Sequence, residues 1–439
     1  GQFVGRVEPL ARLRARYAAA AAGTRQFVLL SGEPGIGKTR LASELAREVH
    51  ADGATVLFGR SDAESLVPYQ PFITAIQHRV AHRQTLYFPP ELMGDLAELG
   101  RFIPALRRHA PSPAPIEDEP EVDRYRLFAA VTRLLAYVAR DHPVVLILDD
   151  IQWADASTVL LLAHMLSDPE PVKLLVVATM RDSETLADEL LDLLARLRRQ
   201  PTMEEIALTG LDPAETEALV LAREGGEVSD ELIRRLHADT DGNPFFIEEL
   251  LRAGEDLGVP EGVKAMISRR LARLDELTVQ VVTAASVMGR EFRLQVLEAL
   301  IPQPTERLIS ALEAAIDAGL IREVEDDVDR FVFAHALVRE ALYESQSAAR
   351  RVRAHHAIAQ ALEALEARFP VGPAELAHHF SESRHLDREG KAIDYAVAAA
   401  QQAAASLSWE QAAGHYRRAL DGDLPAERRC ELLLALGSA

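Results

Sequence analysis

The chain has 439 residues, of which 48% are apolar and only 5% aromatic. This length predicts three or four domains, and the apolar content argues against disorder throughout the chain. The formal net charge of -20 disfavours broad binding to nucleic acids or anionic membranes, because their phosphates repel such a field.

The cysteine content and the two ends of the sequence indicate the cellular compartment that we expect for the protein. The single cysteine, Cys430, excludes an intrachain disulfide and favours a reducing cytoplasm. No apolar run reaches the length of about 18 residues that a membrane span needs, and residues 1–6 carry no signal-peptide pattern. The sequence begins inside a motif and stops within a helical pattern. We therefore expect a cytoplasmic piece of a larger protein.

The first half of the chain alternates short apolar runs with helical stretches. Such alternation predicts a parallel sheet covered by helices on both faces. A helical insert and an exposed, proline-rich loop are expected between residues 66 and 122. The predicted strands lie at residues 27–30, 55–58, 144–148, 174–178 and, more weakly, 205–208.

The second half is mostly helical. Asp212 and Asn243 each precede a proline, and both pairs are expected to open helices with an N-cap and a first-turn proline. Short helices and a possible hairpin at residues 321–333 predict a winged helix. From about Arg351 the pattern is helical only, and the spacing of Trp409 and Tyr416 resembles one tetratricopeptide unit.

Residues 32–39, GEPGIGKT, match the pattern G-x-x-x-x-G-K-[ST] in full, between a predicted strand and a predicted helix. Glycines let such a loop fold around phosphate, and the following helix directs its positive end at the same anion. This P-loop predicts ATP or ADP with Mg²⁺ as the ligand. Lys38 is expected to reach the β- and γ-phosphates, and Thr39 to hold Mg²⁺. The predicted phosphate-binding residues are Gly32, Gly35, Ile36, Gly37, Lys38, Thr39 and Arg40.

A second motif follows the apolar run 144–148, which leads directly into Asp149 and Asp150. An apolar strand that ends in acids beside the P-loop strand is the Walker B arrangement, in which Asp149 holds Mg²⁺ and Asp150 orients the attacking water. Arg181 ends the next predicted strand, at the edge where parallel sheets bind ligands. We expect it to contact the γ-phosphate, with an ion pair to Asp182 or Glu184 as the alternative. The candidate catalytic residues are thus Asp150, Lys38 and Arg181, and the candidate metal ligands are Thr39 and Asp149.

Four further segments carry a resemblance to a known family: residues 3–6 (FVGR), 151–155 (IQWAD), 241–246 (DGNPFF) and 333–340 (FAHALVRE). With the P-loop they resemble the STAND class of signal-transduction ATPases. More closely, they resemble the nucleotide-binding region of large bacterial LuxR-family regulators, the MalT-like group. The same region also occurs fused to nucleotide cyclases and kinases. The resemblance covers nearly the whole chain and is stronger before Pro244 than after it.

This resemblance implies further site residues. Pro244 would reach the adenine from a helical lid, and His335 would touch the β-phosphate of ADP and lock a closed state. The family's usual Asp after that histidine is Ala336 here, which puts the strength of the lock in doubt. Pro244 could equally be a first-turn helix proline, and His335 an ordinary buried or capping histidine. The segment implied to lie against the adenine consists of Val4, Gly5 and Arg6.

The expected organisation is a P-loop nucleotide-binding domain at 1–210, a helical lid at 211–257, a winged-helix domain at 258–350 and helical repeats at 351–439. The expected function is an ATP/ADP switch within a larger regulator, reset by slow Mg²⁺-dependent hydrolysis. ADP would hold it closed, and ATP would open it and allow self-association. An inducer or partner protein would act at the repeats. A transcriptional output would need a DNA-binding segment outside this chain.

Three alternatives stay open. A motor or DNA-loading ATPase of the AAA+ type would show DNA-stimulated turnover, although the acidic charge argues against it. An ATPase module attached to a nucleotide cyclase or kinase fits the same motifs. A pure interaction scaffold with a degenerate site would bind no nucleotide, and the intact P-loop weighs against it.

Two other features favour structural interpretations. The pairs His355-His356 and His378-His379 suggest a metal, but adjacent histidines on a helix point about 100° apart, so one ion rarely takes both. Packing or surface roles are expected. The basic stretch at residues 350–353 is interpreted as a solvated charge run, because the helix that precedes the hairpin is acidic.

Overall fold

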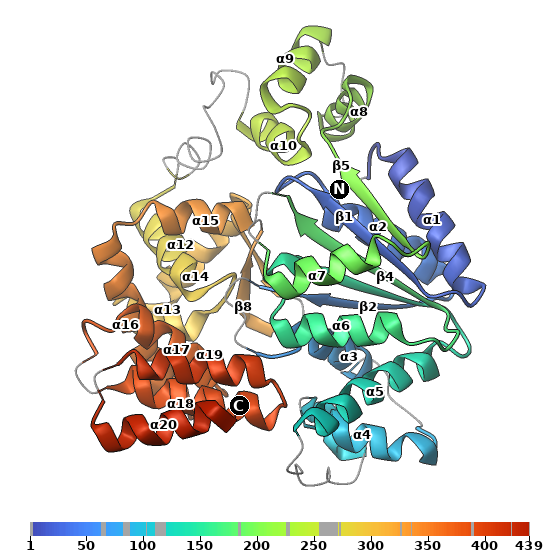
Figure 1. Ribbon diagram of the computed structural model, residues 1–439. Coiled ribbons are helices and arrows are strands. Elements are labelled where there is room, and N and C mark those ends of the chain that lie inside the picture. The colour runs from blue at the N-terminus through green and yellow to red at the C-terminus, as the bar shows by residue number, and fades with distance from the viewer. Residues whose placement is uncertain are drawn as a thin grey trace. The chain divides into compact units, whose positions relative to one another are not determined.

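A computed structural model of the protein describes residues 3–62, 67–81, 88–101, 103–109, 120–182, 186–224, 229–253, 271, 274–324, 327–334, 336–387, 390–422 and 424–438. The chain divides into two compact units. Unit 1 comprises Gly1–Ile247 and Ala403–Gln411, and unit 2 comprises Glu248–Gln402 and Ala412–Ala439. Figure 1 shows the elements of both. The domain boundaries expected at 210, 257 and 350 stay predictions.

A five-stranded parallel sheet is the centre of unit 1 and confirms the predicted strands. The strand order is β2-β3-β4-β1-β5, which corrects one expectation. The acid-bearing strand β3 does not lie beside the P-loop strand β1, because β4 pairs with both and separates them. The strands are β1 (Gln26–Gly32), β2 (Thr55–Arg60), β3 (Val144–Asp149), β4 (Leu174–Arg181) and β5 (Met203–Leu208).

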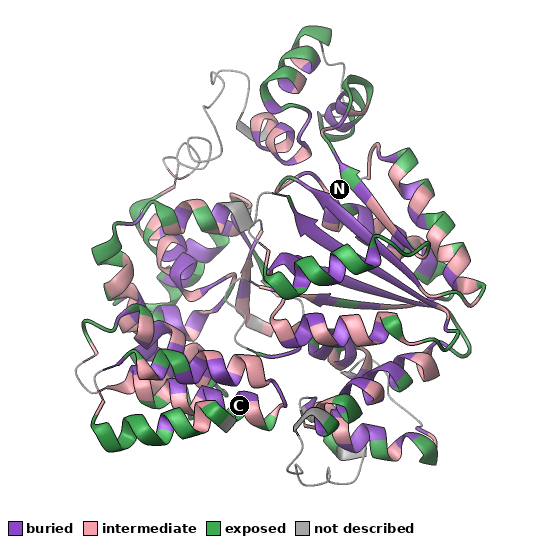
Figure 2. Cartoon of the chain, viewed as in Figure 1, coloured by how far each residue is buried: buried purple, intermediate pink, exposed green. Residues whose placement is uncertain are grey.

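Both faces of this sheet are covered by helices. Side chains alternate along each strand, so Val28 and Leu30 pack on one face while Phe27 and Leu29 pack on the other. The first face is covered by α1 (Val7–Ala21) and α2 (Lys38–Ala51). The second is covered by α3 (Gln70–Ala81), α5 (Pro120–Val138), α6 (Ala156–Ser167) and α7 (Asp188–Leu197). Figure 2 shows the buried strands between helices whose outer sides are exposed.

A helical insert joins β2 to β3, as predicted. After α3 it contains η1 (Pro90–Leu92), α4 (Met93–Leu99), η2 (Pro104–His109) and α5. The predicted proline-rich loop falls mainly on residues 110–119, outside the described part of the chain. Near the insert, the short second segment of unit 1 buries Leu407 fully, and the Tyr69 hydroxyl donates to the Leu407 carbonyl at 3.1 Å.

Three helices follow the sheet: α8 (Pro213–Glu224), α9 (Asp230–Thr240) and α10 (Pro244–Ala253). The predicted N-caps are confirmed, since Asp212 Oδ1 accepts from the Glu215 N–H at 2.7 Å and Asn243 Oδ1 accepts from the Phe245 N–H at 3.1 Å. At the base of these helices two chain segments nearly touch. A Cβ on Gly210 would lie 1.8 Å from the Asp241 carbonyl oxygen, so glycine is required there.

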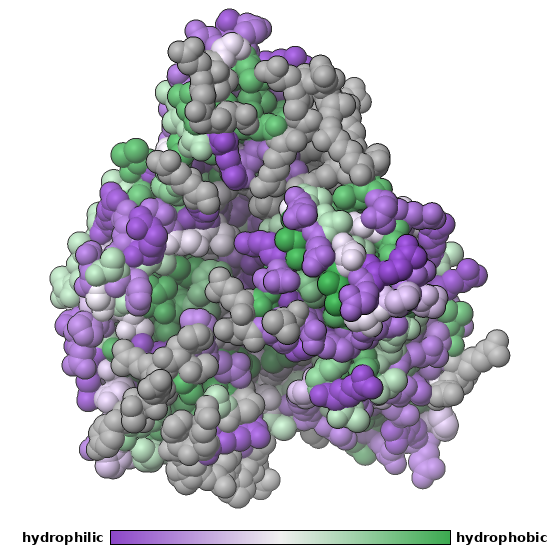
Figure 3. Space-filling model, turned by 180° about the vertical axis from the view of Figure 1, so that it is seen from behind, coloured by the Kyte–Doolittle hydropathy of each residue, from purple (hydrophilic) through white to green (hydrophobic). Residues whose placement is uncertain are grey.

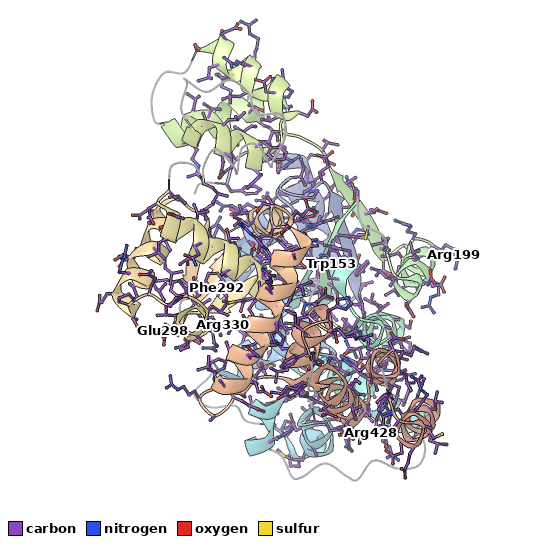
Figure 4. The ribbon with its side chains drawn as sticks, turned by 90° about the vertical axis from the view of Figure 1, so that its left-hand side faces the viewer. Trp153, Arg199, Phe292, Glu298, Arg330 and Arg428 are labelled. Atoms are coloured by element: carbon purple, nitrogen blue, oxygen red, sulfur yellow. The ribbon has the colours of Figure 1, made fainter. Side chains whose placement is uncertain are left out.

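The first part of unit 2 packs helices on a small antiparallel sheet of order β6-β8-β7. The predicted hairpin is confirmed by β7 and β8. Phe292 on β6 stacks on Phe331 of β8 with ring centroids 5.8 Å apart, and Figure 4 labels Phe292 with Arg330. Assignment as a winged helix stays a prediction. The elements are α12 (Glu276–Met288), β6 (Glu291–Arg293), α13 (Leu294–Leu300), α14 (Thr305–Asp317), β7 (Ile321–Val324), β8 (Asp327–Phe333) and α15 (Ala336–Glu344).

The remaining elements are helices only, as predicted: α16 (Ala348–Leu365), α17 (Pro373–Glu382), α18 (Lys391–Ala405), α19 (Trp409–Leu420) and α20 (Ala426–Ser438). Ala412, Tyr416 and Ala419 form the buried stripe of α19. Cys430 is exposed on α20. Figure 3 shows hydrophilic side chains spread widely over the face in view. Among the described helices, none has the length and apolar character needed to cross a membrane.

Candidate functional site

The P-loop connects the carboxyl end of β1 to α2. Gly35 and Gly37 adopt positive φ angles of 81° and 102°, which other residues rarely tolerate, and Gly37 is the N-cap residue of α2. Lys38 is buried, and its Nζ donates to the carbonyls of Gly32 at 2.7 Å and Glu33 at 2.9 Å. Burial lowers the pKa of Lys38 to about 8, against the opposing effect of the nearby Asp150. The loop thus places one buried cation at the N-terminus of a 14-residue helix.

Thr39 and Asp149 meet next to this loop. The Thr39 hydroxyl donates to Asp149 Oδ1 at 2.7 Å, and the Thr179 hydroxyl from β4 donates to the same oxygen at 2.7 Å. Asp149 is fully buried, and its Oδ2 accepts no hydrogen bond. A buried carboxylate oxygen that accepts no hydrogen bond and lies near a hydroxyl suits a hard cation such as Mg²⁺. These two residues therefore fit the predicted metal.

Asp150 lies in a cluster of polar side chains. Its backbone has a left-handed φ of 58°, and its N–H donates to the Thr179 hydroxyl at 2.9 Å. Oδ1 accepts from Gln152 Nε2 at 3.0 Å and lies 3.7 Å from Arg181 Nε. Burial favours a raised pKa for Asp150, but the Gln152 hydrogen bond, Arg60 and Arg181 together lower it. The carboxylate is therefore held ionised and engaged.

Arg181 contacts an acid that neither expectation named. Its Nε lies 3.7 Å from Asp150 Oδ1. Glu184 lies outside the described residues. The Arg181 N–H also donates to Gln152 Oε1 at 3.3 Å. Its position at the carboxyl end of β4 is the predicted one, and its role toward a γ-phosphate stays a prediction.

Arg60 is a site residue that the sequence reasoning missed. It is the last residue of β2, in register with Asp149, and its Nη2 lies 2.7 Å from Asp149 Oδ2 and 3.1 Å from Asp150 Oδ2. By its distance the contact between Arg60 and Asp149 is an ion pair, but it does not have the geometry of a hydrogen bond. An arginine at the carboxyl end of a predicted parallel strand is the signal that could have identified it.

The N-terminal segment contacts both the P-loop and the helices that follow the sheet. Arg6 Nη2 donates to the Ile36 carbonyl at 3.0 Å, and the Arg6 N–H donates to Glu215 Oε1 on α8 at 2.6 Å. Burial lowers the pKa of Arg6, against the opposing effect of Glu215. Gly5 has φ 70°, and a Cβ there would lie 2.7 Å from Glu215 Oε1. Val4 is half-buried beside it.

The start of α10 also reaches the P-loop. Asn243 Nδ2 donates to the Pro34 carbonyl at 3.1 Å, and a Cβ on Gly35 would lie 2.7 Å from Cβ of Phe245. Pro244 is the first residue of α10, as expected. Arg40 is exposed in the first turn of α2, and its phosphate role stays a prediction. His335 lies outside the described residues, so its implied contact with ADP also stays a prediction.

Comparisons with known proteins agree with this geometry. Residues 2–177 match the family model described as AAA ATPase domain. A STAND protein with a tetratricopeptide repeat sensor from Pyrococcus horikoshii aligns over 98% of this chain and 60% of its own, with TM-score 0.52 and 17% identity. The fold is that of an α/β P-loop NTPase. Its C-terminal helices fit the helical repeats of that neighbour, and the family match supports an AAA-type ATPase domain within residues 2–177.

A curated relative is less informative about function. An uncharacterized protein of Rhizobium meliloti (strain 1021) is 24% identical over 385 residues, which are 79% of this chain and 35% of the relative. The chain thus spans about a third of that relative's length. The matched AAA segment ends inside β4, so Arg181 and the helices α8 and α10 lie beyond it.

Proposed function

We propose that this chain is an ATP/ADP-dependent switch, the nucleotide-binding module of a larger signalling regulator. One observation carries the proposal: two segments outside the sheet both bond to carbonyls of the P-loop. Arg6 reaches Ile36, and Asn243 reaches Pro34 from the start of α10. A change in the phosphates held by the loop would therefore act directly on the start of α10, and on α8 through Arg6, which donates to Glu215; these helices serve as the lid.

The proposed nucleotide-binding residues come from the P-loop and Walker B motifs and, for the adenine, from the family resemblance. Lys38 and the backbone N–H groups at the start of α2 would hold the phosphates. Thr39 and Asp149 would hold Mg²⁺, which when bound neutralises phosphate charge. Val4, Gly5, Arg6 and Pro244 would enclose the adenine between the N-terminal segment and the lid.

Hydrolysis at this site would be slow. A general base contributes about 10²–10⁴-fold to rate when it is free to accept a proton. Asp150 is instead engaged by Gln152, Arg60 and Arg181, and its pKa is lowered. Slow turnover suits a protein whose output depends on which nucleotide stays bound rather than on how many are consumed.

The switch itself rests on differential contacts in the two nucleotide states. Arg181 lies at the strand end where a γ-phosphate would add negative charge, and it contacts Asp150. A γ-phosphate would compete with Asp150 for Arg181, and loss of that phosphate would restore the ion pair. The assignment to MalT-like transcriptional regulators rests on the motif resemblance, and its DNA-binding segment would lie outside these 439 residues.

The test compares the lid in two nucleotide states. Amide hydrogen exchange of residues 211–247 is measured with ADP and with a non-hydrolysable ATP analogue, both with Mg²⁺. The proposal expects different protection in the two states, and it expects Arg181→Gln to remove most of the difference. Equal protection with both nucleotides, although both bind, would refute a switch. DNA-stimulated turnover would favour a motor instead.

A further inference from the structure

Three histidines of unit 2 come together where α16 packs against α17. They are His355 on α16 and His378 with His379 on α17, and one ring nitrogen from each lies within 4.8 Å of the others. Within each adjacent pair the two rings point in different directions, and packing or surface roles were expected. One member of the first pair instead meets both members of the second.

The two buried members are already aligned. His355 Nδ1 lies 2.8 Å from His379 Nδ1, and each residue is only 2% exposed. On the far side of the ring, His355 Nε2 lies 3.3 Å from the Tyr343 hydroxyl. A phenol that holds the outer nitrogen fixes the ring so that the other nitrogen faces the cluster, as partners of metal-binding histidines do.

The third member brings the set to three ring nitrogens. His378 is half-buried, and its ring centroid lies 5.1 Å from that of His379 and 5.5 Å from that of His355. The ligand atoms of all three histidines lie within 4.8 Å of one another, which is close enough for one ion to reach each of them.

We propose that His355, His378 and His379 bind one divalent transition-metal ion and so fasten α16 to α17. Imidazole nitrogen suits Zn²⁺, Co²⁺, Ni²⁺ and Cu²⁺, whereas Mg²⁺ and Ca²⁺ prefer oxygen. In a tetrahedral ion the three rings would leave one position for water. The site is distinct from the P-loop site, since it lies in unit 2 and uses nitrogen ligands.

Two arginines near the cluster disfavour the binding of a cation. Arg339 and Arg351 lie near His355, and both guanidinium groups lie over the Tyr343 ring, at 5.7 Å and 5.1 Å. Their charge repels a dication, so the affinity should be weaker than that of a closed structural zinc site. The competing explanation is a neutral His355–His379 hydrogen bond that needs no metal.

The experiment titrates Co²⁺ into the full chain after chelator treatment, in excess Mg²⁺ to occupy oxygen sites. The proposal expects one Co²⁺ per chain, visible absorption typical of tetrahedral coordination, and displacement by Zn²⁺. His378→Gln should weaken binding by at least about tenfold. The matched control is His385→Gln, because His385 is exposed and lies outside the cluster, and it should bind as the parent does.

A variant within the histidine cluster could simply unfold, so two further tests accompany it. Tyr343→Phe keeps the ring and removes only the hydroxyl, and it should weaken Co²⁺ binding by about tenfold if it orients His355. Zn²⁺ should raise the thermal unfolding midpoint of the parent more than it raises that of His378→Gln. Absence of Co²⁺ absorption, or equal binding by His378→Gln and the parent, would overturn the proposal and leave the hydrogen-bond explanation.

Discussion

Replacing Arg60 by Gln tests how the acidic pair is held. Arg60 Nη2 lies 2.7 Å from Asp149 Oδ2 and 3.1 Å from Asp150 Oδ2, and its side chain is 25% exposed against 0% and 12% for the two carboxylates. Removing one partner of a fully buried ion pair costs about 3–5 kcal/mol. Partial exposure of Arg60 reduces that to about 2 kcal/mol, or a fall of roughly 4–8 °C in the unfolding midpoint of a unit of this size.

The same change should strengthen Mg²⁺ binding. Mg²⁺ and the Arg60 guanidinium compete for Asp149 Oδ2, which lies 2.7 Å from Arg60 Nη2, and an ion pair of about 1.4 kcal/mol that Mg²⁺ must displace corresponds to a factor of about ten in affinity. Arg60→Gln should therefore raise the affinity for Mg²⁺, measured with ATP present, by about tenfold. Added Mg²⁺ and ATP should then recover more of the lost thermal stability in the variant than they add to the parent.

The assay is thermal unfolding followed against Mg²⁺ concentration with ATP held fixed. Arg47→Gln is the matched control, because Arg47 pairs with Glu44 on the surface of α2 and is 69% exposed. It should change the midpoint little, as exposed ion pairs contribute about 0–1 kcal/mol. If Arg60→Gln left the midpoint unchanged, or weakened Mg²⁺ binding, Arg60 would not be a competitor for these carboxylates.

Three further predictions concern the P-loop and its contacts. The pKa of Lys38 near 8 lies below its ordinary value of 10.5, so Lys38 of the nucleotide-free protein loses its charge above pH 8. ATP affinity should then fall by up to about tenfold per pH unit above pH 8. Isothermal titration should find that Lys38→Met binds ATP weakly and that its affinity does not change with pH across this range. Thr39→Val should abolish the dependence of ATP affinity on Mg²⁺ while ADP without Mg²⁺ still binds, and an unchanged Mg²⁺ dependence would exclude Thr39 as a ligand. Asn243→Ala should speed release of a fluorescent ADP by about 2–10-fold through the lost bond to Pro34, whereas Ser229→Ala, which removes only the N-cap of α9, should not.

The sequence predicted the features that depend on local pattern. Short apolar runs identified the strands of the large sheet, most clearly β1, β3 and β4, because strands that are buried on both faces need such runs. Asp212 and Asn243 were recognisable as caps because their bonds reach only two or three residues along the chain. The P-loop was the clearest case, because its own glycines allow the positive φ angles that the turn requires.

The features that depend on packing could not be predicted in the same way. The order of the strands depends on where each crossover helix returns the chain to the sheet, and the residue pattern does not reveal this. The position of β4 between β1 and β3 was therefore not expected. Arg60 reaches the acids only because β2 pairs in register with β3. The meeting of His355 with His379 depends on how α16 lies on α17, over 24 residues of sequence separation. Each is a long-range contact between segments whose local sequences are ordinary.

The most direct test of the account is to identify the nucleotide that the purified protein carries. The parent chain and Lys38→Ala are denatured, and the released small molecules are separated by chromatography. The proposed switch predicts adenine nucleotide in near-stoichiometric amount from the parent and its loss from the variant. If the parent released none and also failed to bind added ATP or ADP with Mg²⁺, the P-loop would not be a nucleotide site and the switch would be contradicted.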